Sequence, residues 1–449
     1  MLPRLRGRRL RHWRDHRRDG RDLSPGRPGA PPGLRRRLGL TQVTLAGVGV
    51  ILGAGVYALI GPAAALAGPA LWLAFLLTGV AAGCTAYSYA RIGAMRPRDS
   101  PEFQYTALAF GPRVGFVAGW LMLAADLLAV ATVALGFGGY LAHLTGVPVV
   151  AGALVLLAAA GAVMLVGVGE SVGLAIVLTI VEAAGLVFVI VVGIPFWKNS
   201  TPLEAPHGVS GLVTAAALIF FAYLGFDELG NFAEEMRDPV PDLPRALYYS
   251  MAGATVIYIL VGLSVTAAVD WRELGASSAP LALVARRAVG PGADWLLSLV
   301  ALAATANTVL LLLVSASRSV YGMAGAGVLP PRLAVVGRRA VPTLAALVVT
   351  AIAAAMVLPG NLGRVAALTD AAVLASFMLV SLSLPRLVMT GASGSRGAQR
   401  VVDLAVPGLA VLMCGGLLLH TGGASMAAAA ALALVGYALT FRRGVRDLR

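Results

Sequence analysis

Apolar stretches of about 20 residues recur along nearly the whole of this 449-residue chain. A helix of that length crosses the roughly 30 Å hydrocarbon core of a bilayer. Hydrophobic residues make up 58% of the chain and charged residues 12%, whereas ordinary soluble domains carry roughly 25% charged residues. The sequence therefore predicts an all-α polytopic membrane protein and excludes a soluble globular one.

Charged residues, prolines and glycines divide the apolar stretches into twelve predicted membrane helices. They cover residues 41–67, 69–90, 112–141, 148–168, 171–195, 209–236, 245–269, 292–325, 342–358, 365–385, 402–420 and 424–441. With both termini in the cytoplasm, 17 basic residues beyond the N-terminal tail fall on the inner side and five on the outer side. This bias satisfies the positive-inside rule. We therefore expect a multi-pass protein of the inner membrane with cytoplasmic termini.

The N-terminal tail, residues 1–38, has no apolar periodicity and is predicted to be disordered. Its first 37 residues hold 13 arginines and three aspartates, which supply most of the net charge of +14. Such a basic juxtamembrane segment is attracted to anionic lipid. Trp13 is the only aromatic residue among the arginines apart from histidines, so no nucleic-acid partner is expected.

Two of the predicted helices are interrupted by glycine near the middle of the bilayer. Gly47 to Gly55 contains four glycines, and Gly53 lies about 18 Å along the helix from Thr41. The sixth helix sets Gly225 and Asp227 at a similar depth. Glycine-interrupted helices at corresponding positions are typical of inverted-repeat transporters. The predicted repeats are residues 39–205 and 206–390, and residues 391–449 add two further helices and a short tail.

The first interruption favours anion binding. Free backbone N–H groups at the start of a half-helix carry the positive end of its dipole, and a substrate carboxylate is a fitting ligand for Gly53, Ala54 and Gly55. The alternative reading is that these glycines only allow two helices to pack closely.

Several motifs resemble the amino acid–polyamine–organocation superfamily, in the bacterial branch related to cationic amino acid transporters. They are Ile51-Leu-Gly-Ala-Gly-Val-Tyr57, Gly119-Trp120 with Gly139-Tyr140-Leu141, Phe220-Phe-Ala-Tyr-Leu-Gly-Phe-Asp227 and Ser317-Arg-Ser-Val-Tyr-Gly-Met-Ala324. The resemblance covers residues 41–441. It implies the leucine-transporter fold, a 5+5 inverted repeat with broken helices 1 and 6, and secondary transport of amino acids or related amines.

The resemblance also implies roles for individual residues. The backbone that would contact the substrate's α-carboxylate is that of Ile51, Gly53, Ala54 and Gly55. Ala222 and Leu224 would offer carbonyl groups to the substrate's amino group. Phe221 matches the family's aromatic gate, and Asp227 matches an acidic or polar position just below it.

Ionisable residues inside a membrane cost about 2.5–3.5 kcal/mol on insertion scales and point to function. Glu182 stands where proton-coupled relatives commonly carry a lysine, so it inverts the local charge. It would exchange a proton, ligate a cation or form a protonated structural hydrogen bond. Asp227 would assist in coupling or cap the half-helix that follows it. Asp126 and Asp370 are weaker candidates.

Glu234 and Glu235, at the predicted cytoplasmic end of the sixth helix, are expected to pair with arginines such as Arg91. No enzyme is predicted, because Lys198 is the only lysine and no Gly-x-x-x-x-Gly-Lys-Ser/Thr loop exists. Two cysteines and scattered histidines offer no metal-ligand spacing. No cofactor is expected.

We therefore expect a secondary active transporter that moves amino acids by alternating access, with proton symport through Glu182 and Asp227. The alternatives are an exchanger or sodium-coupled carrier, a channel, and a non-transporting sensor. The expected lining of Ala54, Ala131, Ala222 and Leu224 is small and apolar, which slightly favours neutral amino acids, while the buried acids keep cationic amino acids and amines in play.

Overall fold

The computed structural model describes residues 38–95, 101–166, 172–229, 236–325, 327–336 and 341–441. The basic N-terminal tail, Glu234 and Glu235 lie outside these residues. The regular structure of the described residues is helical apart from one isolated bridge between Leu38 and Met236. The prediction of an all-α polytopic membrane protein is confirmed.

Each predicted membrane helix has a counterpart among the described residues. The corresponding elements are α1 (Leu40–Ile51) with α2 (Gly55–Ala67), α3 (Leu71–Met95), α5 (Pro112–Thr145), α6 (Val149–Val166), α7 (Val172–Gly193), α8 (Gly208–Ile219) with η4 (Phe220–Tyr223), α9 (Pro239–Ala268), α12 (Ala293–Gly325), α13 (Thr343–Val357), α14 (Leu362–Met389), α15 (Gly397–Leu419) and α16 (Gly423–Leu439). By length and composition, eight helical stretches are able to cross a membrane, and four further apolar helices are shorter.

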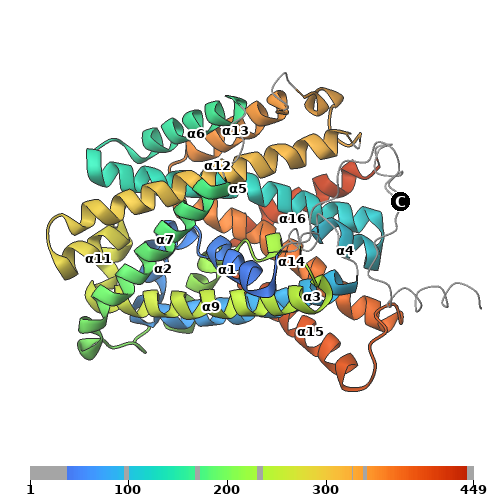
Figure 1. Ribbon diagram of the computed structural model, residues 1–449, viewed down its shortest axis with the longest axis horizontal. Helices are drawn as coiled ribbons and strands as arrows, with labels where there is room; N and C mark the ends of the chain where they lie inside the picture. Colours follow the sequence, from blue (N-terminus) through green and yellow to red (C-terminus); the bar gives the residue numbers. More distant parts are fainter. Residues whose placement is uncertain are drawn as a thin grey trace, which may run out of the picture. The chain divides into compact units, whose positions relative to one another are not determined.

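The helices form two packed groups (Figure 1). In one group α9 packs along α3 and α1, and α2 packs on α8. In the other, α5 packs against α6, α12, α13 and α14. The two helices that the sequence predicts to be interrupted both belong to the first group, and α7 and α14 flank it.

Small residues allow helices of this bundle to approach closely, as is usual where lipid supplies no hydrophobic driving force between helices. A Cβ atom on Gly79 of α3 would lie 2.6 Å from the Thr255 hydroxyl of α9. One on Gly136 of α5 would lie 2.7 Å from the Cβ atom of Ala58 in α2. These positions accept nothing larger without a shift of the helices.

Three short helices were not predicted: α4 (Pro101–Phe110), α10 (Trp271–Ala276) and α11 (Pro280–Val289). Each is too short to span a bilayer, so apolar run length could not reveal it. α4 folds back onto α5 through Gly111, whose φ of +91° favours glycine. The backbone oxygen of Phe103 approaches Gly115 so closely that a Cβ atom there would lie 2.6 Å from it.

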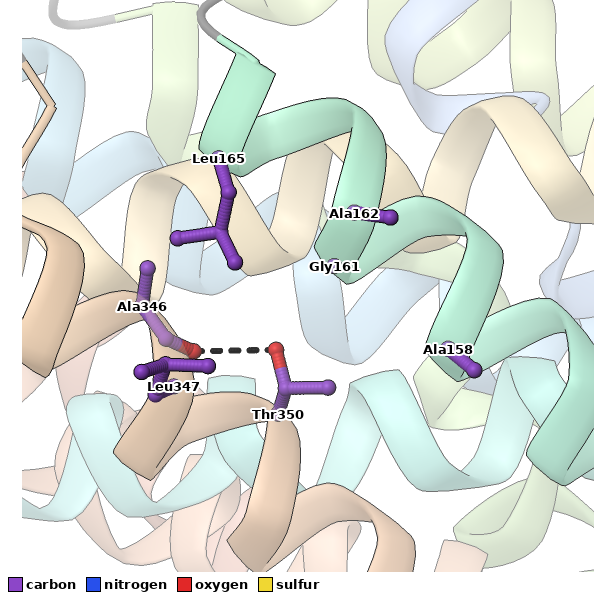
Figure 2. Close-up of a pocket in the computed structure, with 7 residues that line it drawn as sticks. All are labelled: Ala158, Gly161, Ala162, Leu165, Ala346, Leu347 and Thr350. Atoms are coloured by element: carbon purple, nitrogen blue, oxygen red, sulfur yellow. Dashed lines mark hydrogen bonds between the residues drawn. The ribbon is translucent and has the colours of Figure 1, made fainter. Parts of the chain in front are cut away.

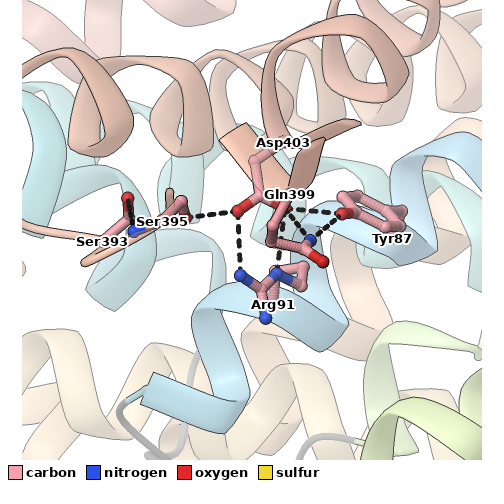
Figure 3. A network of polar contacts seen from close by, with 6 residues as sticks. All are labelled: Tyr87, Arg91, Ser393, Ser395, Gln399 and Asp403. Carbon is pink, nitrogen blue, oxygen red and sulfur yellow. Dashed lines mark hydrogen bonds and ion pairs between the residues drawn. The ribbon is translucent and has the colours of Figure 1, made fainter. Parts of the chain in front are cut away.

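A buried carboxylate joins α15 to α3 (Figure 3). Asp403 has a fully buried side chain and accepts hydrogen bonds from Arg91 Nε (3.0 Å) and Nη2 (2.8 Å) and from Gln399 Nε2 (2.8 Å). The hydroxyl groups of Tyr87 and Ser395 also donate to it. Arg91 pairs with Asp403 because α15 lies against α3 at this level, whereas Glu234 and Glu235, its predicted partners, lie outside the described residues.

We predict that Asp403→Asn lowers the free energy of unfolding by about 2 kcal/mol, because several donors lose a charged acceptor. Thermal unfolding of the purified protein in detergent measures this. Arg91→Gln should cost less on the Asp403→Asn background than alone. Asp270→Asn is the matched control, since the ion pair of Asp270 with Arg272 is exposed and exposed pairs contribute little. Equal effects of the two Asn variants would contradict the prediction.

Candidate functional site

The first helix is interrupted where the sequence predicts it. α1 ends at Ile51, three residues are not helical, and α2 begins at Gly55. Among the described residues, no acceptor takes a hydrogen bond from the amides of Gly53, Ala54 and Gly55. These are the free donors that a half-helix presents at its start.

The sixth predicted helix is also interrupted. α8 ends at Ile219, tightens into the 3₁₀ turn η4, and continues through Leu224 in an extended conformation. Gly225 follows with φ of +108°, which a side chain rarely adopts. Residues 227–229 form a further turn. The chain therefore leaves helical geometry close to Ala222, at the level proposed for the substrate.

The two interruptions touch each other. A Cβ atom on Gly55 would lie 2.8 Å from the Cα atom of Ala222 and 3.0 Å from the Phe221 ring. A Cβ atom on Gly225 would lie 2.7 Å from the Val50 side chain at the end of α1. The structure thus brings Gly55, Phe221 and Ala222 together, as the sequence predicts for one site.

Tyr258 of α9 contacts both interruptions. Its hydroxyl lies 2.5 Å from the Ile51 carbonyl oxygen and 2.8 Å from that of Ala222. One hydroxyl group therefore donates to two backbone oxygens that the interruptions leave without a helical partner. The sequence analysis missed this residue. The available signal was a tyrosine in the middle of an apolar span, where a buried hydroxyl group needs a partner.

Glu182 of α7 lies beside the first interruption. Its side chain is 3% exposed, and the Tyr57 hydroxyl donates to its backbone oxygen at 2.6 Å. One turn earlier, Thr179 packs so tightly on Gly49 of α1 that a Cβ atom there would lie 2.4 Å from it. A negative charge on Glu182 interacts electrostatically with the hydroxyl groups of both Tyr57 and Tyr258. Its Oε1 atom has no hydrogen-bond partner among the described residues.

Small apolar side chains surround the interruptions. Ala54, Ala131 and Phe221 belong to one buried cluster, and Leu224 packs against it. Thr305 of α12 donates its hydroxyl hydrogen to the backbone of its own helix, at 2.6 Å from the Ala301 oxygen. It therefore contributes no free polar group here.

Asp227 forms part of a second group of acids. Its Oδ1 atom accepts the Gly225 amide at 3.0 Å, so it stabilises the turn that precedes it. It is 5% exposed, and its charge acts on Glu102 of α4. Glu102 is 7% exposed and accepts the Tyr89 hydroxyl at 2.8 Å. Asp126 of α5 interacts with the same charges.

Burial raises the pKa of Glu102 to about 8, and the carboxylates of Asp227 and Glu228 act in the same direction. Glu102 lies in α4, outside the candidate spans. The carboxyl group is therefore protonated in the folded protein at neutral pH, where an unfolded chain would ionise it.

A pocket of about 240 Å³ lies away from these groups, between α6 and α13 (Figure 2). Its lining residues are Ala158, Gly161, Ala162, Leu165, Ala346, Leu347 and Thr350. The only side-chain hydroxyl group, that of Thr350, already donates to the Ala346 oxygen at 2.9 Å. No free polar group remains there to orient an amino acid.

We predict that Gly55→Ala lowers the free energy of unfolding by about 1–3 kcal/mol, because the added methyl group would collide with the Ala222 backbone. Gly53→Ala is the matched control, since its Cβ atom would meet only the Val50 oxygen, at 3.3 Å. Thermal unfolding of both variants compares them. A Gly55→Ala protein as stable as the Gly53→Ala protein would show that the two interruptions are not in contact.

We also predict that the stability of the folded protein depends on pH through Glu102. A carboxyl group whose pKa is raised on folding stabilises the protein at low pH, and this contribution is lost between the ordinary value of 4.5 and about 8. Within that window Glu102 should remove up to about 1.4 kcal/mol of stability per pH unit. Unfolding midpoints across this range should therefore fall more steeply for the wild type than for Glu102→Gln. Parallel curves would refute the assignment.

Comparison with known proteins identifies the family of this chain. The sequence profile described as amino acid permease matches residues 38–439. The branched-chain amino acid permease of Bacillus subtilis is 27% identical over 91% of this chain and 93% of its own length. The methylthioribose transporter of the same organism is 30% identical over 78% of this chain and 80% of its own. Mouse cationic amino acid transporter 4 is 33% identical over 66% of this chain and 50% of its own. The chain belongs to the amino acid permease family of the amino acid–polyamine–organocation superfamily, and is a multi-pass membrane transporter of amino acids.

Proposed function

We propose that this amino acid transporter is proton-coupled and works by alternating access, with its substrate held between the two helix interruptions. The close approach of Gly55 to the Phe221 ring and to the Ala222 backbone is the observation that carries the proposal. It supports one site built from both halves of the chain, as expected of an inverted-repeat transporter whose repeats are residues 39–205 and 206–390.

Complementary backbone groups recognise the substrate's two charged ends. The free amides of Gly53, Ala54 and Gly55 bind the α-carboxylate at the positive end of the α2 dipole. The carbonyl groups of Ala222 and Leu224 accept the α-ammonium group. In the structure the Tyr258 hydroxyl donates to the Ala222 oxygen, so the substrate's ammonium group competes with this hydroxyl for that acceptor. Phe221 closes over the bound molecule.

The proton is carried by Glu182. Its Oε1 atom has no hydrogen-bond partner among the described residues, and an unpaired charge is costly inside a membrane. Binding a proton removes that charge. A change in the geometry of the first interruption therefore changes the affinity of Glu182 for the proton, and this couples proton movement to transport. Asp227, which supports the second interruption through the Gly225 amide, is an accessory group.

The lining favours a neutral side chain. Ala54, Ala131 and Phe221 are apolar and tightly packed, and among the relatives one is named for branched-chain amino acids. Others are named for methylthioribose and for cationic amino acids, so relatedness alone does not choose the side chain. We place neutral amino acids first because of the lining.

The orientation follows from charge. Basic residues gather in segments that share a side with both termini, so both ends lie in the cytoplasm. The basic tail of residues 1–38 then lies next to the cytoplasmic leaflet, where anionic lipid attracts it. The two helices α15 and α16 in residues 391–449 lie outside the repeats.

We predict that Glu182→Gln abolishes the dependence of uptake on a proton gradient. Proteoliposomes at about pH 7.5 inside and about pH 5.5 outside should accumulate radiolabelled L-leucine or another neutral amino acid through the wild-type protein. The variant should lose this accumulation, because an amide does not exchange a proton, and should keep counterflow of the same amino acid.

Glu204→Gln is the matched control. Glu204 is an exposed acid that accepts the Thr201 hydroxyl at 2.8 Å, and its replacement should leave uptake unchanged. Wild-type pH dependence in Glu182→Gln would refute the coupling role. Stimulation by a sodium gradient alone would favour a sodium-coupled carrier, counterflow without net uptake an exchanger, and unsaturable flux a channel. Binding without any flux would favour a sensor.

A further inference from the structure

The carboxyl group of Asp370 is buried and unpaired at the second interruption. Its side chain is fully buried in α14, and neither oxygen has a hydrogen-bond partner among the described residues. The backbone amide of Phe221 acts on it electrostatically without reaching hydrogen-bond geometry. A buried, unsatisfied carboxyl group costs stability, so its presence needs an explanation other than packing.

The described acids on α4, α5 and α15, which pack against α14, interact with partners other than Asp370. On α5, Asp126 interacts with the acids Glu102, Asp227 and Glu228, and Glu102 belongs to α4. On α15, Asp403 pairs with Arg91 of α3. None of these charges acts on Asp370 within the described part of the chain.

The polar groups next to Asp370 are neutral. Thr369 donates its hydroxyl hydrogen to the Val365 oxygen at 3.0 Å and lies 3.4 Å from the Thr132 hydroxyl of α5. In the described residues, no three His, Cys, Asp or Glu side chains converge to hold a metal ion. The species that neutralises Asp370 without further ligands is a proton.

Asp370 also corresponds in position to Glu182. α7 is the fifth of the predicted spans and α14 the tenth, so each is the last helix of its proposed repeat. Glu182 lies beside the interruption of the first helix of its repeat, next to Tyr57. Asp370 lies beside the interruption of the first helix of the other repeat, next to Phe221. The last helix of each repeat therefore sets a buried acid against the interruption of the first helix.

We propose that Asp370 is a second proton-binding site of the transporter, the counterpart of Glu182 in the second repeat. The inference rests on the proposed proton coupling and extends it. A proton moves between water and one Asp370 oxygen, with no other bond made or broken.

Ionisation of Asp370 changes how the gate is held. An ionised carboxylate accepts hydrogen bonds about twice as strongly as a neutral group, so it attracts the Phe221 amide and draws the η4 backbone toward α14. Protonation weakens this attraction and frees the Phe221 backbone to move over the substrate. Asp370 is thus a positioning residue for the gate, whereas the first repeat couples its proton through Glu182.

Infrared difference spectroscopy of the full-length protein in lipid nanodiscs tests the proposal directly. Protonated carboxyl groups absorb apart from ionised ones, so a titration from about pH 5 to about pH 9 reports each buried acid. Asp370→Asn should remove one titrating carboxyl band, and Glu182→Gln a different one. Asp370→Glu should shift the first band and keep its titration, and Glu204→Gln should change neither.

The substrate response completes the test. An equimolar mixture of the twenty L-amino acids should change the intensity of the Asp370 band in the wild type, because closing of the gate alters its surroundings. A spectrum unchanged by Asp370→Asn would overturn the proposal. So would a band that neither titrates nor responds to the mixture, since it would belong to a permanently protonated structural acid.

Two further outcomes separate this inference from the proposed function. Loss of the Asp370 band on adding L-arginine alone, and not on adding L-leucine, would make Asp370 a partner of a cationic side chain and overturn the proton site. A titrating Asp370 band, together with a Glu182→Gln spectrum that has lost no titrating carboxyl band, would uphold Asp370 and refute coupling through Glu182. If Asp370→Asn does not fold, the band shift in Asp370→Glu decides.

Discussion

The structure depends on the contact between two stretches of backbone that leave helical geometry inside the membrane. Gly55 lies against Ala222, and Gly225 lies against Val50, so each interruption covers the other. Unwound backbone is tolerated at this depth only where protein or a cavity surrounds it. Neither interruption would be stable alone, because each leaves amides or carbonyl groups without helical partners. The pairing of the two halves of the chain follows from this requirement.

The surrounding helices supply what the two interruptions cannot supply to each other. Tyr258 of α9 reaches the carbonyl oxygens of Ile51 and Ala222, and Tyr57 ties α2 to α7 through the Glu182 backbone. Tyr140 of α5 donates in turn to the Tyr57 oxygen at 3.1 Å. Tyrosine suits this task because its ring packs among apolar side chains while its hydroxyl group satisfies one buried carbonyl. The amides from Gly53 to Gly55 have no acceptor in the part of the chain that the structure describes, and they form a surface suited to a carboxylate.

The sequence predicted the parts of the fold that local patterns encode. Apolar run length located the twelve apolar helices, eight of them long enough to cross a membrane in the described residues, and the glycines near Gly53 and Gly225 located both interruptions. The short helix α4 was missed because ten residues cannot span a bilayer. The roles of Tyr258 and Asp403 were missed for a different reason. Their partners lie 207 and 312 residues away along the chain, and no local pattern determines which helices become neighbours.

The distribution of the acids separates a structural charge from the two proposed proton-binding groups. Asp403 is buried but receives five donors, two of them from Arg91, so it remains ionised and joins two helices. Glu182 and Asp370 are equally buried, yet each has at least one oxygen without a donor in the described residues. A fully satisfied carboxylate has little reason to change its protonation, whereas an unsatisfied one gains by binding a proton. Of these three acids, Glu182 and Asp370 lie beside the interruptions, where a conformational change alters their surroundings, and Asp403 lies at the α3–α15 contact.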